Sequence, residues 1–490
     1  MVAESIDIQK SELFKNQCYI NGSWVDADDG STSDIINPAN SKQLGTVPNC
    51  GSSEALKAIQ AAKEAHKFWS KTDAKERSSV LKKLHGLMLE HQEDLARIIT
   101  YEGGKPLSES MGEIAYAASF FEWFSEEAKR VYGDVIPGHQ QDRRTLVIKQ
   151  PIGVVGCITP WNFPSAMLAR KIAPAIAVGC TVVAKPAPET PYSATAMAYL
   201  SDLAGIPKGV FNVVTGDAEK IGSIMTSNKD VKKITFTGST AVGKHLLKQS
   251  ADTVKKVSLE LGGHAPFIVF DDASLDDAVD GALIAKYRNS GQTCVCANRI
   301  YVQSSIYDDF TKRFTEKASQ LVVGDGLLES TQQGPLINKD AMKKASKHIE
   351  DAKNKGATIT TGGNPHSLGG LFFEPTVLTG ASDEMLIAQE ETFGPVAPIF
   401  SFDSEKEVLE RANNTPYGLA AYFYTSDLGK SWRVSEQLDY GMVGLNTGII
   451  STEMAPFGGI KESGIGREGS KYGVDDYLEM KYISLAGIEE

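Results

Sequence analysis

Residues 154–158 (VVGCI) begin the part of the sequence that decides the fold. This run carries no charged residue and has the length of a buried strand. After it the pattern alternates, with helix 163–178, strand 181–184 (TVVA), helix 190–203, strand 211–214 (FNVV), helix 218–226 and strand 233–236 (KITF). This order is typical of a parallel, doubly wound sheet. We therefore predict an α/β protein with a Rossmann-type domain.

A second α/β unit is predicted to begin near residue 262. A strand at 266–270 (PFIVF) precedes helical patterns over 307–319 and 339–354. Upstream of the first unit, an amphipathic helical region covers 53–99 and another helix covers 110–130, while 144–149 forms a strand of a projecting hairpin. The chain thus contains two α/β units and a separate β element.

Composition excludes several classes of function. A chain of 490 residues is long enough for two or three domains, and its net charge of −12 argues against nucleic-acid binding. Residues 151–169 are uncharged but contain three prolines, so we expect no membrane span, and the first ten residues show no secretory signal. The six cysteines are scattered and show no zinc-ligand spacing, which favours a reducing, cytoplasmic setting without a bound metal.

Three motifs carry the parts of a reaction at a carbonyl carbon. Cys294 follows small polar residues in 289–296 (NSGQTCVC) and is the candidate nucleophile. Glu260 lies between two leucines in 259–266 (LELGGHAP), where an apolar setting raises a carboxyl pKa and suits a general base. Asn162, in 159–164 (TPWNFP), can donate to an oxyanion. A structural role is the usual one for a single cysteine, but the three motifs together favour catalysis.

In this order the motifs resemble those of the aldehyde dehydrogenase family along nearly the whole chain. The matching segments are 161–162 (WN), 185–187 (KPA), 236–243 (FTGSTAVG), 259–263 (LELGG), 291–294 (GQTC), 391–395 (ETFGP) and 456–459 (PFGG). Residues 287–296 and 464–473 are most similar to the succinate-semialdehyde dehydrogenases of that family. The resemblance implies a cofactor-binding domain (1–130 and 150–261), a catalytic domain (262–473), and an oligomerisation element (131–149 and 474–490) that builds a homodimer or homotetramer.

The cofactor site lacks the usual dinucleotide fingerprint, since no GxGxxG follows the first strand. Instead Gly238, Ser239 and Gly243 lie where a strand leads into a helix, whose N-terminus favours phosphate. An ordinary helix cap is the alternative for this segment alone. The family resemblance makes it a pyrophosphate site.

Other cofactor contacts are also implied by the resemblance. Lys185 corresponds to a residue that contacts the adenosine ribose, while Glu391 and Phe393 hold the nicotinamide ribose and ring, with Trp161 assigned to the same site. NAD-preferring relatives often carry a glutamate where this chain has Pro188. Because no carboxylate at that position repels a 2′-phosphate, we expect NADP, with NAD as the alternative.

The resemblance also implies the substrate. Arg170, Arg288 and Ser451 match the positions that bind the carboxylate of succinate semialdehyde, although Arg170 alone could be a solvated helix residue. The expected reaction is oxidation of succinate semialdehyde to succinate with reduction of NAD(P), as in 4-aminobutyrate degradation. Glutarate semialdehyde or a broad range of aldehydes is the alternative. A non-catalytic, crystallin-like role disagrees with the intact Cys294, Glu260 and Asn162.

Cys296 is not required by this chemistry. If residues 294–296 were extended, the two sulfurs would point the same way and could form a strained, reducible disulfide. We therefore consider a redox role for Cys296 that protects Cys294. The alternative is that Cys296 packs as a small apolar side chain.

Overall fold

The computed structural model describes residues 6–488 and is built around two large sheets. The first has eight strands in the order β19 (Gly464–Ile465), β11 (Lys256–Glu260), β10 (Val231–Thr237), β7 (Val154–Ile158), β8 (Thr181–Lys185), β9 (Phe211–Val213), β1 (Cys18–Ile20) and β2 (Ser23–Val25). Strands β11 to β9 are parallel, while β19 at one end of the sheet and β1 and β2 at the other pair antiparallel with their neighbours. The predicted doubly wound sheet is confirmed.

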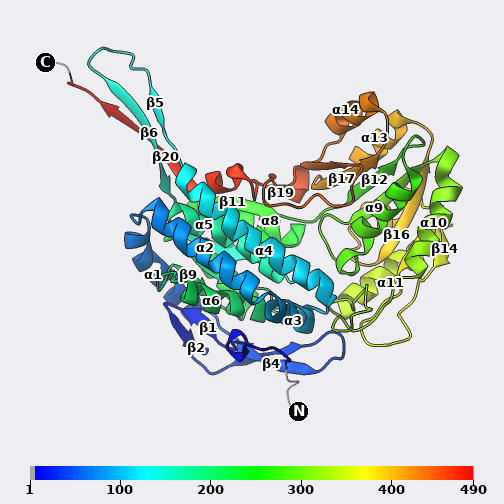
Figure 1. Ribbon diagram of the computed structural model, residues 1–490, viewed down its shortest axis with the longest axis horizontal. Helices are drawn as coiled ribbons and strands as arrows, with labels where there is room; N and C mark the ends of the chain where they lie inside the picture. The colour runs from blue at the N-terminus through cyan, green and yellow to red at the C-terminus, as the bar shows by residue number, and fades with distance from the viewer. Residues whose placement is uncertain (1–5, 489–490) are drawn as a thin grey trace.

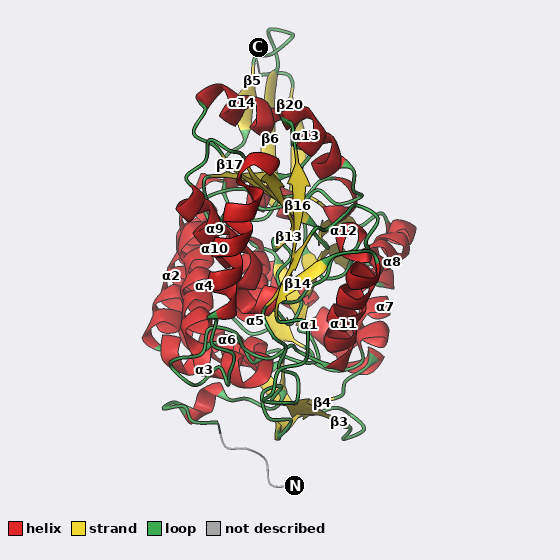
Figure 2. Ribbon diagram, turned by 90° about the vertical axis from the view of Figure 1, so that its right-hand side faces the viewer, coloured by secondary structure: helices red, strands yellow, loops and turns green. Residues whose placement is uncertain are grey.

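Helices cover both faces of this sheet, as Figure 2 shows for α2, α4 and α6 on one side and α7 and α8 on the other. The helices of this half are α1 (Ser52–Trp69), α2 (Ala74–Glu90), α3 (Gln92–Gly103), α4 (Leu107–Glu127), α5 (Pro164–Val178), α6 (Tyr192–Ala204), α7 (Ala218–Ser227) and α8 (Thr240–Ser250). Strand residues alternate between two apolar cores, with Val155 and Val182 in one and Val154 and Val183 in the other. Burial on both faces explains their continuous apolar runs.

The second sheet has seven strands and is parallel except at one edge. Their order is β14 (Thr358–Thr361), β15 (Thr376–Thr379), β16 (Val396–Phe402), β13 (Ala297–Gln303), β12 (Ala265–Val269), β17 (Ala420–Tyr424) and β18 (Met442–Leu445). Its helices are α9 (Leu275–Tyr287), α10 (Tyr307–Ser319), α11 (Lys339–Asn354), α12 (Leu386–Gln389), α13 (Glu405–Asn413) and α14 (Leu428–Gln437). It forms the second α/β unit, on the right in Figure 1.

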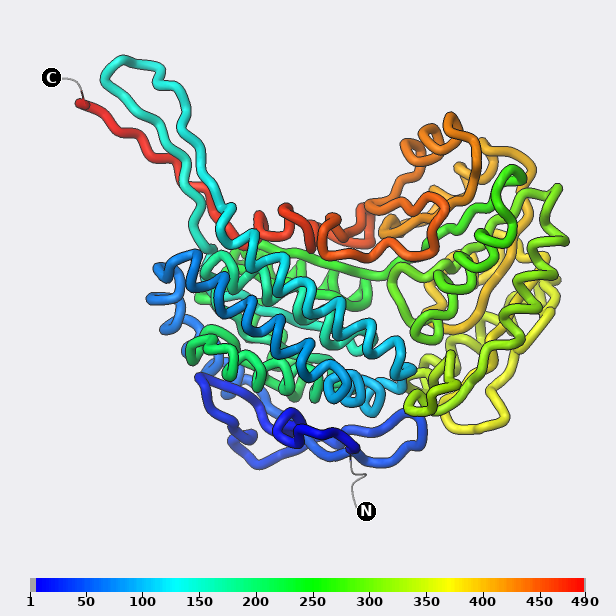
Figure 3. Tube along the Cα trace, in the orientation of Figure 1, coloured from blue at the N-terminus to red at the C-terminus, as the bar shows by residue number. Residues whose placement is uncertain are grey.

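A three-stranded sheet projects from the body, at the upper left of Figure 1. Strands β5 (Asp134–Ile136) and β6 (Arg144–Pro151) form the predicted hairpin, and β20 (Leu478–Leu485) pairs antiparallel with β6 along its whole length. Figure 3 shows the C-terminal part of the chain leaving the second half and crossing back over the first. Strand β19 belongs to this returning segment, so the chain rejoins the first sheet before residue 473.

Several details differ from the sequence expectations. The helical region 53–99 is three helices, α1 to α3, because the chain turns at residues 70–73 and again at His91. The N-terminal strands β1 and β2, and the separate hairpin of β3 (Thr32–Ile36) and β4 (Gln43–Pro48), were not expected. Within the described residues no helix is both long and apolar enough to span a membrane. Residues 1–5 and 489–490, which belong to the expected domain ranges and signal-free N-terminus, lie outside the described part.

Candidate active site

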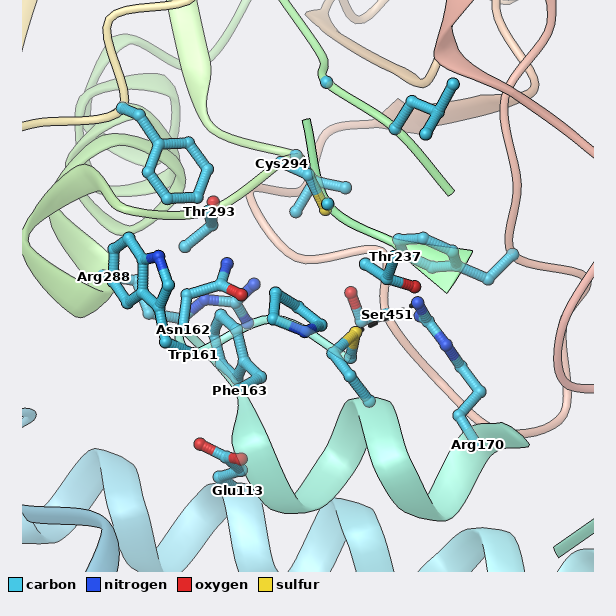
Figure 4. A pocket seen from close by; sticks show the side chains of 18 of the residues that line it. Glu113, Trp161, Asn162, Phe163, Arg170, Thr237, Arg288, Thr293, Cys294 and Ser451 are labelled. Carbon is cyan, nitrogen blue, oxygen red and sulfur yellow. Dashed lines mark hydrogen bonds between the residues drawn. The ribbon is translucent and has the colours of Figure 1, made fainter. Parts of the chain in front are cut away.

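A cavity of about 550 Å³ lies between the two α/β units. Its walls come from the turn after β7, the end of β10, the segment after β11, the loop before β13 and the loop before β16. Cys294, Asn162, Arg170, Arg288 and Ser451 all line it, and Figure 4 shows them around one space. Residues far apart in the sequence therefore meet at one site.

The candidate nucleophile lies in a tightly folded loop between η4 (Arg288–Gly291) and β13. Asn289 and Ser290 have left-handed φ angles of 51° and 58°, and Gly291 continues the same conformation at 72°. Cys294 itself is partly exposed to the cavity. Burial raises the pKa of its thiol to about 12, and the Arg170 guanidinium opposes that shift. Without substrate or cofactor in the cavity, the Cys294 thiol is thus mainly protonated at neutral pH.

Asn162 is held next to this loop by hydrogen bonds in both directions. Its side-chain Nδ2 donates to the Gln292 carbonyl at 2.9 Å, and Nδ2 of Asn289 donates back to the Asn162 carbonyl at 3.1 Å. One N–H of the Asn162 amide remains for a ligand, because the amide nitrogen carries two. The backbone N–H of Cys294 donates to no other residue of the described chain. Two donors are therefore available close to the thiol.

Glu260 ends β11 and is almost fully buried. It does not line the cavity, although the next two residues, Leu261 and Gly262, do. Neither of its carboxyl oxygens has a hydrogen-bond partner among the described residues. Burial, reinforced by the neighbouring Glu468, raises the pKa of Glu260 well above its ordinary value. The burial inferred from the flanking leucines is present, but charged groups such as Glu468 and Arg170 lie nearby, and Glu260 is not among the residues that line the cavity with Cys294.

The segment that opens α8 lies against the cavity, but its two glycines lie in different surroundings. Gly238 and Ser239 line the cavity, and the Ser239 hydroxyl caps the helix by accepting from the Val242 N–H at 3.4 Å. Gly243 is buried outside the cavity lining, and a Cβ there would lie 2.3 Å from a methyl carbon of Leu261. The absence of a side chain at Gly243 therefore permits close packing against Leu261, and a cofactor contact at Gly243 stays a prediction.

The other cofactor candidates divide between two places. Glu391 and Phe393 line the cavity, where the Phe393 ring meets Trp161 edge to face at 5.6 Å and Glu391 accepts from the Gly263 N–H at 3.1 Å. Burial raises the pKa of Glu391 to about 7. Lys185 is buried at the end of β8, away from the cavity lining, and burial lowers its pKa to about 8.

The Lys185 ammonium forms no hydrogen bond or ion pair within the described chain, and Pro188 lies exposed three residues later. The Thr237 hydroxyl, at the end of β10, is buried against the cavity and also has no partner. The two polar groups lie at the carboxyl ends of β8 and β10, on either side of β7, and α/β folds bind ligands at that edge of the sheet. They fit a dinucleotide.

The two candidate substrate arginines differ in their surroundings. Arg170 is buried on α5, stacks on the Phe457 ring at 4.0 Å and forms an ion pair with Glu468. The solvated-helix alternative for Arg170 is therefore wrong. Arg288 is half-buried over the Phe163 ring at 5.5 Å and forms no ion pair or hydrogen bond with a described residue. It is the cavity arginine whose charge is left without a bonded partner.

The extended conformation expected around Cys296 is not present. The N–H of Cys296 donates to the Thr293 carbonyl at 3.2 Å, which closes a turn across Cys294. The Cys296 thiol is buried, donates to the Lys286 carbonyl at 3.4 Å and does not line the cavity. The premise of a disulfide between Cys294 and Cys296 is thereby removed, because the two side chains do not follow the alternation of a strand.

The cavity also contains residues that sequence reasoning missed: Glu109, Glu113, Tyr116, Lys344 and Phe457. Tyr116, on α4, has a buried hydroxyl without a hydrogen-bond partner in the described chain. The packing of α4 beside α5 brings Glu109, Glu113 and Tyr116 to the cavity, and no local motif indicates that. Lys344 comes from α11, and Phe457 belongs to the 456–459 motif but was not assigned to the site. No group of three or more His, Cys, Asp or Glu side chains within residues 6–488 is arranged to hold a metal ion.

Residues 24–483 match the model of the aldehyde dehydrogenase family. The chain belongs to this family, which confirms the resemblance inferred from its motifs.

The chain is also similar to named enzymes and to solved structures. The chain is 58% identical to a glutarate-semialdehyde dehydrogenase of Pseudomonas aeruginosa, with 99% of this chain and all of that protein covered. It is 57% identical to the NADP(+)-dependent succinate-semialdehyde dehydrogenase GabD of Escherichia coli, with 98% and 99% covered. A solved structure of succinate-semialdehyde dehydrogenase from Burkholderia pseudomallei superposes with a TM-score of 0.97 at 55% identity, covering 98% of this chain and all of that one.

Proposed function

We propose that this protein oxidises succinate semialdehyde to succinate with reduction of NADP or NAD. The observation that carries the proposal is the Arg288 guanidinium, which shares one cavity with Cys294 and has no bonded partner in the described chain. A half-buried cation in this setting favours a substrate with an anionic group at the end remote from the aldehyde. The name of the similar Escherichia coli enzyme supports this substrate.

The chemistry begins with attack of the Cys294 thiolate on the aldehyde carbon. The oxyanion that forms is stabilised by the free N–H of the Asn162 amide and by the backbone N–H of Cys294. Because burial raises the pKa of the thiol, the attacking thiolate must form as the site is loaded, and the Arg170 guanidinium favours it. A bound nicotinamide supplies the hydride acceptor, and a thioester on Cys294 is left.

Glu260 then activates the water that hydrolyses the thioester. Its carboxyl group lies beside Glu468 and outside the cavity lining, so this role requires the side chain to turn towards Cys294. The raised pKa shows that burial favours the protonated form of Glu260, whereas contact with water in the cavity would favour loss of the proton. A carboxyl group without hydrogen bonds is free to make that change.

Preference for NADP is supported by the region after β8. Lys185 offers an unpartnered ammonium group, and the position three residues later is the exposed Pro188 rather than a carboxylate. A 2′-phosphate therefore meets a cation and no direct repulsion. NAD remains the alternative.

Glutarate semialdehyde is the second candidate substrate, because an equally similar relative acts on it and it also carries a terminal carboxylate. It is one methylene longer than succinate semialdehyde, a difference that pockets distinguish by about 1–3 kcal/mol. The test measures kcat/KM for both semialdehydes and for butanal, each with NADP and NAD. We expect the highest value with succinate semialdehyde and NADP. A highest value with butanal would contradict an anion-selective site and favour a broad-range enzyme.

The projecting sheet is proposed to join subunits into a homodimer or homotetramer. In this division of the chain, the cofactor-binding domain is 1–130 and 150–261, and the catalytic domain is 262–473. The oligomerisation element is 131–149 and 474–490. Val135, Met480 and Tyr482 expose most of their apolar surface on this element, which is costly in an isolated chain. The six unpaired thiols support a reducing, cytoplasmic location. Sedimentation equilibrium measures the subunit number.

A further inference from the structure

We propose that Glu109 is a positioning residue that fixes the loop carrying Cys294. The inference rests on the proposed function only in that Cys294 is taken as the nucleophile. Glu109 lies on α4, lines the cavity and is half-buried. It was not indicated by any sequence motif.

The loop needs external support because its backbone is unfavourable. Asn289 and Ser290 both have left-handed φ angles, and Gly291 follows with the same sign. A side chain at Cβ crowds the backbone in this conformation, so consecutive residues adopt it only where surrounding contacts impose it. The conformation of these three residues sets where the chain places Cys294.

Glu109 supplies the contact at the start of this strained segment. Its Oε2 accepts a hydrogen bond from the backbone N–H of Asn289 at 2.8 Å. The Asn289 side chain in turn donates to two carbonyls, that of Asn162 at 3.1 Å and that of Gln292 at 3.2 Å. Asn289 thus joins the oxyanion turn to the nucleophile loop, and Glu109 fixes the backbone from which that link extends.

The same face of α4 also orients the neighbouring helix. Glu113, one turn after Glu109, accepts from the backbone N–H groups of Ser165 at 2.9 Å and Ala166 at 3.2 Å, at the start of α5. Figure 4 shows Glu113 below that first turn, on the side away from Cys294. One helix therefore holds both the segment that follows Asn162 and the segment that precedes Cys294, and their relative placement depends on it.

The hydrogen bond, rather than the charge, is the feature that matters. Burial raises the pKa of Glu109, while Lys105, the Asn289 N–H and Arg288 lower it and Glu113 raises it further. A carboxyl oxygen accepts from Asn289 in either protonation state, and so does the amide oxygen of glutamine. Glutamine at position 109 should therefore preserve the hydrogen bond to Asn289 and the position of the loop, whereas alanine or methionine should not.

The experiment compares Glu109→Gln, Glu109→Met and Glu109→Ala with Glu122→Ala, an exposed control on the same helix. Methionine keeps the volume without the acceptor, so it remains informative where alanine impairs folding. We expect kcat to fall at least tenfold in the methionine and alanine variants, with KM and cofactor Kd within about threefold of wild type. Glutamine should stay within threefold in kcat. A glutamine variant as slow as methionine, or a methionine variant with normal kcat, would overturn the proposal.

A second measurement needs no aldehyde and separates this inference from the proposed substrate. Iodoacetamide labelling of Cys294, followed by peptide mass spectrometry, should slow at least fivefold in Glu109→Met and be restored in Glu109→Gln. Asn289→Asp, which keeps the backbone N–H and removes the side-chain donor, should slow labelling similarly. In a double-mutant cycle the Glu109→Met effect should shrink to less than twofold in the Asn289→Asp background. Fully additive effects would show that Glu109 does not act through Asn289.

Discussion

The nucleophile loop and the end of β11 are assigned to different steps of the same reaction, and their side chains are held very differently. In the loop, Glu109 accepts from the Asn289 N–H, and the side chains of Asn162 and Gln292 donate to loop carbonyls, so the backbone before Cys294 is fixed. At the end of β11, Glu260 is buried, and its two carboxyl oxygens have no hydrogen-bond partner within residues 6–488. Next to it Gly458 has no side chain, and a Cβ there would lie 3.0 Å from Oε1 of Glu260.

This difference matches the tasks assigned to the two regions. The atoms that form and stabilise the covalent bond need a fixed geometry, since small misplacements of reacting groups cost large factors in rate. A base that must receive a water molecule later needs freedom to move. An unpaired buried carboxyl group is costly to maintain, and that cost is consistent with a side chain that works in more than one position.

The largest expected effect comes from removing the thiol of Cys294, the nucleophile held by the rigid loop. Cys294→Ala should lower turnover by about a thousandfold or more, because no other cysteine among the described residues lines the cavity. Binding of the reduced cofactor, followed by fluorescence, should stay near the wild-type Kd because the mutation leaves the Gly238 and Ser239 segment intact. Turnover above a trace would show that another residue attacks the aldehyde.

Substitution of Glu260, the side chain proposed to move, should affect the later step in which the thioester is hydrolysed. Glu260→Gln should lower steady turnover by about a hundred- to ten-thousandfold while the first burst of reduced cofactor survives. Rapid-mixing absorbance measures both phases in one experiment. If the burst and the steady rate fall together, Glu260 acts before the thioester forms and the contrast between the two regions does not hold.

The arginine pair sharpens the comparison at the substrate end of the cavity. Arg288→Ala should raise KM for succinate semialdehyde about ten- to a hundredfold and leave KM for butanal nearly unchanged, since a charge-assisted contact contributes about 1.5–3 kcal/mol.

Arg170→Ala provides the contrast, because Arg170 is already paired with the buried Glu468. Breaking such a pair costs about 3–5 kcal/mol, so the variant should lose stability and activity with both aldehydes. Thermal unfolding and KM measured for the two variants distinguish these effects. Equal changes in KM for both aldehydes in Arg288→Ala would assign Arg288 a structural role.

The smallest effect is expected far from both regions, at Pro188. Pro188→Glu places an exposed carboxylate near Lys185, where it repels a 2′-phosphate by about 1 kcal/mol, or roughly fivefold. The ratio of kcat/KM for NADP to that for NAD should fall by this factor. A wild-type enzyme that already prefers NAD strongly would contradict the argument from the missing acid.

Much of the fold could be predicted because local patterns in the sequence, such as apolar runs, indicate the buried strands. The parallel strands β7 and β8 are buried on both faces, and their sequences contain the apolar runs that predicted them. Strands β1 and β2 were missed because they have only three residues each and β2 is largely uncovered. Runs this short carry little periodicity.

The site was predictable only where its residues lie in motifs. Glu109 and Tyr116 were missed because the packing of α4, and no local pattern, brings them to the cavity. The conformation around Cys296 was wrongly expected to be extended because the left-handed residues before it, held by tertiary hydrogen bonds, turn the chain. The ion pair that buries Arg170 joins it to Glu468 near the other end of the chain, which no sequence spacing reveals.

Trapping the acyl-enzyme shows whether Cys294 carries the thioester that Glu260 helps to hydrolyse. Glu260→Gln is mixed with succinate semialdehyde and NADP, quenched in acid and analysed by peptide mass spectrometry, with Cys294→Ala as the control. We expect one succinyl group, attached to the peptide that contains Cys294, and none in the control. An unmodified Cys294 after a full burst, or an acyl group on another residue, would contradict it.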